Sequence, residues 1–170
     1  MKKLLLVLAV LGGTAVSCFA QSSGGTAKFS IGVDAAIPTG TSSDIYNAGF
    51  GGSIKYEAPV ATNLYATLSA GYEAFMVKSE FTDLGAKSSY GFVPLKAGLK
   101  YYFMEDGSGF FGEAQIGAAI STESGGGTAF AYAPGVGYTV DGGFEAGIRY
   151  EGWAKDGTFG QFALRLAYRF

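Results

Sequence analysis

Apolar side chains alternate with polar or small ones along most of this chain. The pattern is clearest in the last ten residues, QFALRLAYRF, where the apolar row is Phe162, Leu164, Leu166, Tyr168 and Phe170. A period of two predicts a β-strand, because successive side chains of a strand point to opposite faces. The same alternation between turn signals predicts eight strands. They cover residues 28–37, 47–58, 63–78, 89–103, 109–121, 128–140, 143–153 and 159–170.

The two faces of these strands differ sharply in chemistry. One face carries aliphatic and aromatic residues and no charge. The other holds every charge of the strand cores, and glycine and alanine fill many positions between them. The charged residues are Lys28, Asp34, Lys55, Glu57, Glu73, Lys96, Lys100, Glu113, Glu145, Arg149, Glu151, Arg165 and Arg169. A soluble lipocalin-like barrel would bury the apolar face, whereas a membrane barrel turns it to lipid.

Three features favour the membrane arrangement. Small residues on the charged face suit the narrow bore of an eight-stranded barrel. Seven positive and six negative charges nearly cancel, as enclosed charges must, because an unpaired one costs several kcal/mol to desolvate. Aromatic residues of the apolar face gather near the strand ends, as at the two interfaces of a bilayer. We therefore expect an all-β fold: a closed eight-stranded antiparallel up-and-down transmembrane β-barrel with a polar, filled lumen and an apolar exterior.

The connections between strands also differ in length. Those at 38–46, 79–88, 122–127 and 154–158 are the longer set, and those at 59–62, 104–108 and 141–142 the shorter. Outer-membrane barrels have short periplasmic turns and longer external loops, so both termini are expected in the periplasm. Pro94 and Pro134 fall within strands. Because proline cannot donate to the ladder, we expect a bulge or a strand break at each.

The N-terminus predicts export from the cytoplasm. Residues 1–20 combine Lys2 and Lys3, a short apolar run and a small-residue site ending at Ala20, which indicates a cleaved signal peptide. Residues 21–27 would form a short N-terminal segment and residues 28–170 the barrel domain. The sequence AVSC before residue 19 also loosely resembles a lipobox, which would instead make Cys18 a lipidated N-terminus. Removing Lys2 and Lys3 leaves 10 basic and 14 acidic residues. The chain has no basic tail, and we therefore do not expect nucleic acid as a partner.

Residues 28–170 resemble the small eight-stranded outer-membrane β-barrels of Gram-negative bacteria, the OmpA/OmpX-like family. The resemblance rests on the strand count, the loop asymmetry and the C-terminal LRLAYRF. It implies residence in the bacterial outer membrane, in contact with outer-membrane lipid and lipopolysaccharide. It also implies insertion by the barrel-assembly machinery, for which Tyr168 and Phe170 look like the terminal signal.

The inward charges are the candidate functional residues. The sequence contains no histidine, so histidine-based catalysis and histidine-ligated metal sites are excluded, and we expect no enzyme activity, metal or cofactor. We expect a lumen charge network instead, with Lys100 and Glu113 at one level near the periplasmic end and Glu145 paired with Arg169. Trp153 is expected to anchor the external rim. The network would consist of Lys96, Lys100, Glu113, Glu145, Arg149, Glu151, Arg165 and Arg169.

These observations favour an integral outer-membrane barrel with a structural, adhesive or lipid-interacting role and a plugged lumen. Two alternatives stay open at this point. One is a narrow channel or transporter for small or apolar solutes, and the other is a secreted, soluble, lipocalin-like ligand-binding barrel. The sequence does not identify an external ligand or host surface, because the loops that would bind it have a generic composition.

Overall fold

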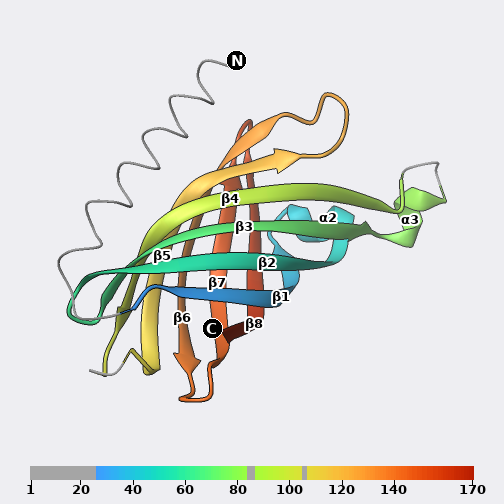
Figure 1. Cartoon of the computed structure of the whole chain (residues 1–170). Coiled ribbons are helices and arrows are strands. Elements are labelled where there is room, and N and C mark those ends of the chain that lie inside the picture. The colour runs from blue at the N-terminus through green and yellow to red at the C-terminus, as the bar shows by residue number, and fades with distance from the viewer. Residues whose placement is uncertain (1–25, 84–86, 105–106) are drawn as a thin grey trace.

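Eight antiparallel strands close into one barrel in the computed structural model, which describes residues 26–83, 87–104 and 107–170 (Figure 1). The strands are β1 (Lys28–Thr39), β2 (Tyr46–Ala61), β3 (Leu64–Val77), β4 (Ser89–Tyr102), β5 (Gly109–Ser121), β6 (Thr128–Thr139), β7 (Phe144–Ala154) and β8 (Thr158–Arg169). Two short helices, α2 (Ser42–Ile45) and α3 (Ser79–Thr82), lie in connections. The expected signal peptide, residues 1–20, lies outside the described residues. The predicted up-and-down topology is confirmed.

Every strand pairs with its neighbours in sequence, and the first strand closes the barrel against the last. In that closing ladder Asp34 of β1 lies opposite Arg165 of β8. Closure leaves no strand with an unpaired edge, which is the condition a sheet must meet where no water can satisfy its backbone. None of the helices in the described part of the chain is long and apolar enough to cross a membrane.

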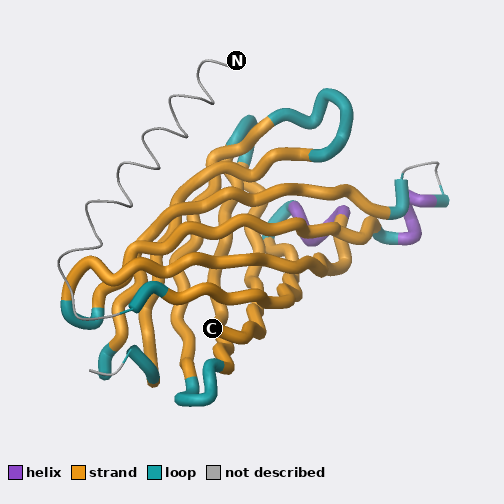
Figure 2. Tube along the Cα trace, in the orientation of Figure 1, coloured by secondary structure: helices purple, strands orange, loops and turns teal. Residues whose placement is uncertain are grey.

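The connections form two groups at opposite ends of the barrel (Figure 2). We call the end with residues 40–45, 78–83, 87–88, 122–127 and 155–157 the loop end, and the end with residues 62–63, 103–104, 107–108 and 140–143 the turn end. Both ends of the strand series, Lys28 and Arg169, lie at the turn end. Several strands run further than the alternation predicted: β1 continues through Pro38 to Thr39, and β2 continues through Pro59 to Ala61.

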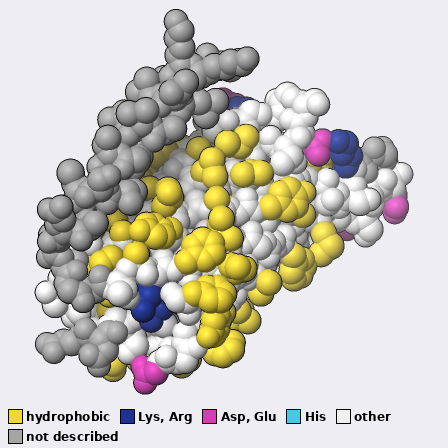
Figure 3. All heavy atoms as spheres, viewed as in Figure 1, with side chains coloured by type: hydrophobic (Ala, Val, Ile, Leu, Met, Phe, Trp, Pro, Cys, Tyr) yellow, Lys and Arg dark blue, Asp and Glu magenta, His cyan; other side chains and the backbone are white. Residues whose placement is uncertain are grey.

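The apolar face of the strands points outward. Ile37, Ile116 and Leu166 expose 67, 61 and 50% of their surface, while Lys100 and Lys96 expose 0 and 5%. Figure 3 shows hydrophobic side chains over the middle of the visible face and charged ones towards its ends. The predicted apolar exterior and polar interior are therefore confirmed. The alternative of a soluble lipocalin-like barrel is wrong, because that fold would place the same apolar row inside.

The expectation of a bulge or strand break at Pro94 and Pro134 is wrong. Both strands continue through the proline with an unchanged register, and each proline pairs with β5, Pro94 opposite Ala119 and Pro134 opposite Ala114. Pairing lapses only on the other side. The β3–β4 ladder skips Gly71 and Tyr72, and the β6–β7 ladder skips residues 133–134 and 150–151. The missing N–H therefore removes pairing with one neighbour, and the barrel keeps its register across the gap.

Candidate functional site: the barrel lumen

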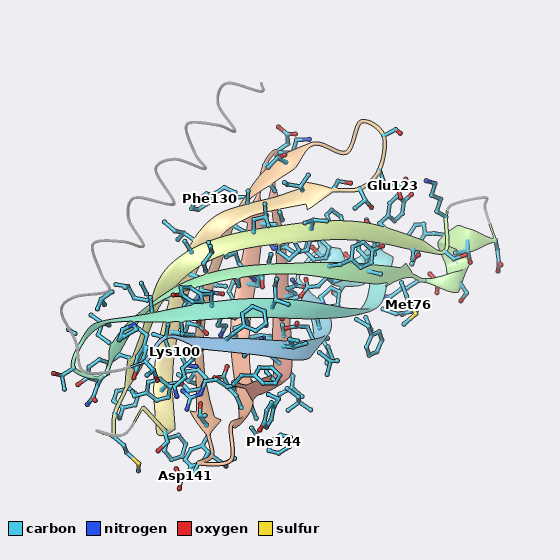
Figure 4. The ribbon with its side chains drawn as sticks, in the orientation of Figure 1. Met76, Lys100, Glu123, Phe130, Asp141 and Phe144 are labelled. Carbon is cyan, nitrogen blue, oxygen red and sulfur yellow. The ribbon has the colours of Figure 1, made fainter. Side chains whose placement is uncertain are left out.

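The inward faces of all eight strands fill the lumen with charged side chains. Figure 4 shows Lys100 among the side chains that the strands enclose, while Phe144 points away from the barrel. The eight residues named from the sequence all form ion pairs or hydrogen bonds there. Four further inward charges join them: Asp34, Lys55, Glu57 and Glu73. The alternation placed these four on the inward face but gave no reason to select them as partners.

One group of charges surrounds Lys100 in the half of the lumen nearer the turn end. Lys100 is fully buried and contacts both Glu145 and Glu57, with 2.8 Å between its Nζ and Glu57 Oε1. Arg165 also donates to Glu145, at 3.2 Å. We call this group the Lys100 cluster. Its members are Lys55, Glu57, Lys100, Glu113, Glu145, Arg165 and Arg169.

A second group surrounds Arg149, nearer the loop end. Its guanidinium donates to three carboxylates: Asp34 at 2.7 Å, Glu73 at 3.1 Å and Glu151 at 2.8 Å. Lys96 Nζ lies 2.6 Å from Glu151. We call these five residues the Arg149 cluster. A planar guanidinium suits this position because its five N–H groups can serve several carboxylates at once.

Ser53 joins the two clusters. Its hydroxyl donates to Asp34 at 2.6 Å and accepts from Arg165 Nε at 2.9 Å. The Lys100 cluster holds four cations and three anions, and the Arg149 cluster two cations and three anions. Together they contain six of each sign. Such a balance lets twelve enclosed charges share a bore that could not accommodate an unpaired one.

The expected pairings within the network need correction. Lys100 and Glu113 do lie opposite each other in the β4–β5 ladder, but Glu113 pairs with Lys55 at 2.6 Å. The expected pair of Glu145 with Arg169 is wrong. Glu145 contacts Lys100 and Arg165, while Arg169 donates to the Tyr102 hydroxyl at 2.7 Å. Most of these partners lie on strands that face each other across the bore. Estimating the height of each residue along its own strand does not predict contacts between such distant strands.

Aromatic rings fill the lumen at the loop end. We call this group the aromatic cap: Tyr46, Phe75, Phe92, Trp153 and Phe159, one from each of five strands. Trp153 stacks on Phe159 with 5.3 Å between ring centroids. The expectation that Trp153 anchors the outer rim is wrong, because the residue is 3% exposed and its indole N–H donates to Glu151 at 2.8 Å. Trp153 shares the parity of Glu151, and that signal could have placed it inside.

Inward glycines make room for these rings. Gly49 faces Phe75 in the β2–β3 ladder, and a Cβ at Gly49 would lie 2.5 Å from the Phe75 ring. Gly137 stands in the same relation to Phe111 near the turn end, where a Cβ would lie 2.3 Å from the ring. Phe111 in turn packs under Lys100, whose Nζ lies 4.0 Å from the ring centroid. The glycines of the charged face therefore accommodate rings as well as long charged chains.

A cavity of about 40 Å³ remains between the two clusters. Residues of both clusters line it, including Lys55, Glu73 and Arg165. Glu113 Oε1 is buried without a hydrogen-bond partner among the described residues. A polar cavity of this size holds one or a few water molecules, and one of them can satisfy that oxygen. Within residues 26–83, 87–104 and 107–170, no group of acidic or cysteine side chains is arranged to hold a metal ion.

Comparison with solved structures identifies the fold. The attachment invasion locus protein Ail of Yersinia pestis matches with a TM-score of 0.57 and 16% identity, over 85% of this chain and 97% of that one. The N-terminal β-barrel domain of Pseudomonas aeruginosa OprF matches with a TM-score of 0.57 and 16% identity, over 84% and 97%. Neisserial surface protein A matches with a TM-score of 0.55 and 16% identity, over 84% and 95%.

Comparisons of the amino-acid sequence, in contrast, find no match. No model of a known protein family matches the chain, and no curated protein sequence matches it either. The TM-scores of 0.57, 0.57 and 0.55 show a shared architecture, and a likeness at 16% identity leaves activity open. The chain therefore has the fold of the small eight-stranded outer-membrane β-barrels.

Proposed function

We propose that this protein is an integral barrel of a bacterial outer membrane whose lumen is closed to solutes. The observation that carries the proposal is the reversed sidedness of the strands, with apolar residues exposed and twelve charges enclosed. An exposed apolar belt of this extent is costly in water and is expected where a barrel meets acyl chains. Ail, a structural neighbour, has also been solved in a phospholipid bilayer nanodisc.

The charge clusters and the aromatic cap, which together fill the lumen, favour a closed barrel and argue against a channel. The Arg149 and Lys100 clusters cross the bore by direct ion pairs, and the aromatic cap covers them at the loop end. The cavity left between the clusters, about 40 Å³, is of water size. We therefore expect the protein to act through its presence in the membrane and through its surfaces, in a structural, adhesive or lipid-interacting role without catalysis.

The lengths of the connections give the proposed orientation of the barrel in the membrane. The turn end, with both ends of the strand series, would face the periplasm, and the loop end would face the exterior with its lipopolysaccharide. Residues 1–20 would direct export. Tyr168 of β8 and Phe170, which directly follows β8, would be read by the barrel-assembly machinery. Both side chains are exposed on the outer surface, at 42 and 65%, where a partner can reach them during insertion.

Two experiments test this function. The protein should stay with the envelope after carbonate washing, and it should migrate faster on a gel when left unheated. Release by carbonate would contradict membrane integration. In planar bilayers the purified barrel should show little or no steady conductance. Reproducible single-channel steps would instead support the narrow channel and overturn the closed lumen.

A further inference from the structure

The mouth of the barrel at the loop end contains a pocket that the closed-lumen function does not use. Its volume is about 330 Å³, within the range typical of small-molecule sites. Phe92, Trp153 and Phe159 of the aromatic cap line it, together with Thr41, Ser42, Gly126 and Gly127 from two loop-end connections. It therefore sits above the plug and opens away from the charge clusters.

The pocket exists because the rings of the aromatic cap come from one side of the barrel. They project from β2, β3, β4, β7 and β8. Of the three other strands, β5 and β6 line the pocket with the small side chains of Ala119, Ser121 and Ala129, and β1 contributes no lining residue. Small side chains opposite large ones leave a hollow with an aromatic wall and an aliphatic wall. Such a hollow matches a flat ring.

One charged residue lines this pocket among those that the structure describes, and it is Lys155 in the β7–β8 connection. Its Nζ donates to the Gly126 carbonyl at 3.0 Å. A Cβ at Gly127 would lie 2.7 Å from the same Nζ, so glycine at this position leaves space for the ammonium. A lysine ammonium has three N–H donors, and two are left for a ligand.

We propose that this pocket binds a small aromatic carboxylate, with the ring against Phe92, Trp153 and Phe159 and the carboxylate on Lys155. An ammonium–carboxylate hydrogen bond is charge-assisted and is stronger than a neutral one. The aromatic and alanine walls supply apolar burial for the ring. A cationic ring compound would meet the Lys155 ammonium as a like charge and is disfavoured.

Trp153 provides a direct reporter, because it is the single tryptophan of the sequence. The full-length barrel in detergent would be titrated with benzoate, with benzyl alcohol and with benzylammonium. Trp153 fluorescence would be followed, and bound benzoate would be counted in parallel by equilibrium dialysis. Benzoate should bind saturably with one molecule per chain and change the fluorescence. Benzyl alcohol should bind more weakly, and benzylammonium weakest of the three.

Two variants test the assignment, and one serves as a matched control. Lys155→Gln should weaken benzoate binding about tenfold through the lost charge-assisted bond, and Ala129→Leu should abolish it by filling the hollow. Lys87→Gln alters an exposed loop lysine that pairs with Glu123 outside the pocket and should leave binding unchanged. Retained heat-modifiability on a gel shows that each variant folds. The proposal would be overturned if equilibrium dialysis detected no bound benzoate, if benzylammonium bound as tightly as benzoate, or if Lys155→Gln left benzoate binding unchanged.

Discussion

The two ends of the lumen are filled by different physical means. Near the turn end, the Lys100 cluster fills the bore with buried ion pairs, such as Lys100 with Glu57. At the loop end, the aromatic cap fills it with packed rings, such as Trp153 on Phe159. Ion pairs depend on the identity and charge of each partner, whereas ring packing depends on volume and shape. The same bore should therefore respond to substitution in two different ways.

Methionine substitutions separate these two kinds of filling, because methionine is apolar, flexible and of intermediate size. In the Lys100 cluster it removes a charge while keeping a long side chain. In the aromatic cap it replaces one apolar shape by another. We expect the first change to be severe and the second to be tolerated.

The largest effect is expected for Lys100→Met. Lys100 contacts both Glu57 and Glu145 and is fully buried, so its loss leaves two enclosed carboxylates with less positive charge. Breaking a buried ion pair on one side costs about 3–5 kcal/mol. Equilibrium urea unfolding of the barrel in lipid vesicles should show this loss. Lys87→Met, which removes an exposed loop lysine that is also ion-paired, should cause no measurable change, and equal effects of the two would contradict the account.

Substitutions of Phe75 in the aromatic cap should change stability according to the side-chain volume that is lost, as in the core of a soluble protein. Its ring is fully buried and contacts Tyr46, Phe92, Trp153 and Phe159. Phe75→Ala should cost about 3–4 kcal/mol through lost burial and the cavity left behind. Phe75→Met should cost less than about 1.5 kcal/mol, because it conserves most of the volume. The same unfolding assay measures both, and a Phe75→Met variant as unstable as Lys100→Met would remove the distinction between the two ends.

A charge exchange tests whether single pairs in the Lys100 cluster have defined partners. Lys55 and Glu113 lie 2.6 Å apart across the bore. Glu113→Lys alone should destabilise the barrel, and adding Lys55→Glu should restore part of the loss. The coupling free energy should fall between about 0.5 and 3 kcal/mol, as for contacting residues. Strictly additive effects in unfolding experiments would mean that the pair is not formed.

The smallest effect is expected in the backbone ladder of the barrel, outside the Lys100 cluster and the aromatic cap. Pro134→Ala restores an N–H where the β6–β7 ladder is interrupted. One added hydrogen bond contributes about 1 kcal/mol at most, and some of this is offset by the greater freedom of the unfolded chain. Hydrogen exchange should show the new amide protected. Rapid exchange of that amide would indicate that the gap has a cause other than the missing donor.

Alternation in the sequence was sufficient to predict the barrel and the sidedness of its charges. Lys96, Lys100 and Arg165 were placed inside because each shares a strand face with small residues. That inference is local, since a strand fixes which of two faces a residue occupies. Partners are not local. Lys55 of β2 meets Glu113 of β5, and their contact depends on the shape of the closed bore.

The aromatic cap shows what the same method overlooked. Phe75, Trp153 and Phe159 have the parity of Glu73, Glu151 and Gln161, so the alternation itself placed them inside. Aromatic residues near strand ends were instead associated with membrane interfaces, which led to the wrong position for Trp153. Inward glycines were attributed to a narrow bore. Their placement opposite particular rings, as with Gly49 and Phe75, depends on strand register, which parity alone does not determine.

The central claim is that apolar residues face lipid while the aromatic cap is enclosed, and tryptophan quenching tests it directly. The barrel would be placed in vesicles of phospholipids brominated near the middle of their acyl chains, which quench tryptophan on contact. Native Trp153 should be quenched weakly. A Leu164→Trp variant in a Trp153→Phe background, with its tryptophan on the outer face of β8, should be quenched strongly. Stronger quenching of Trp153 than of the substituted position would contradict the account.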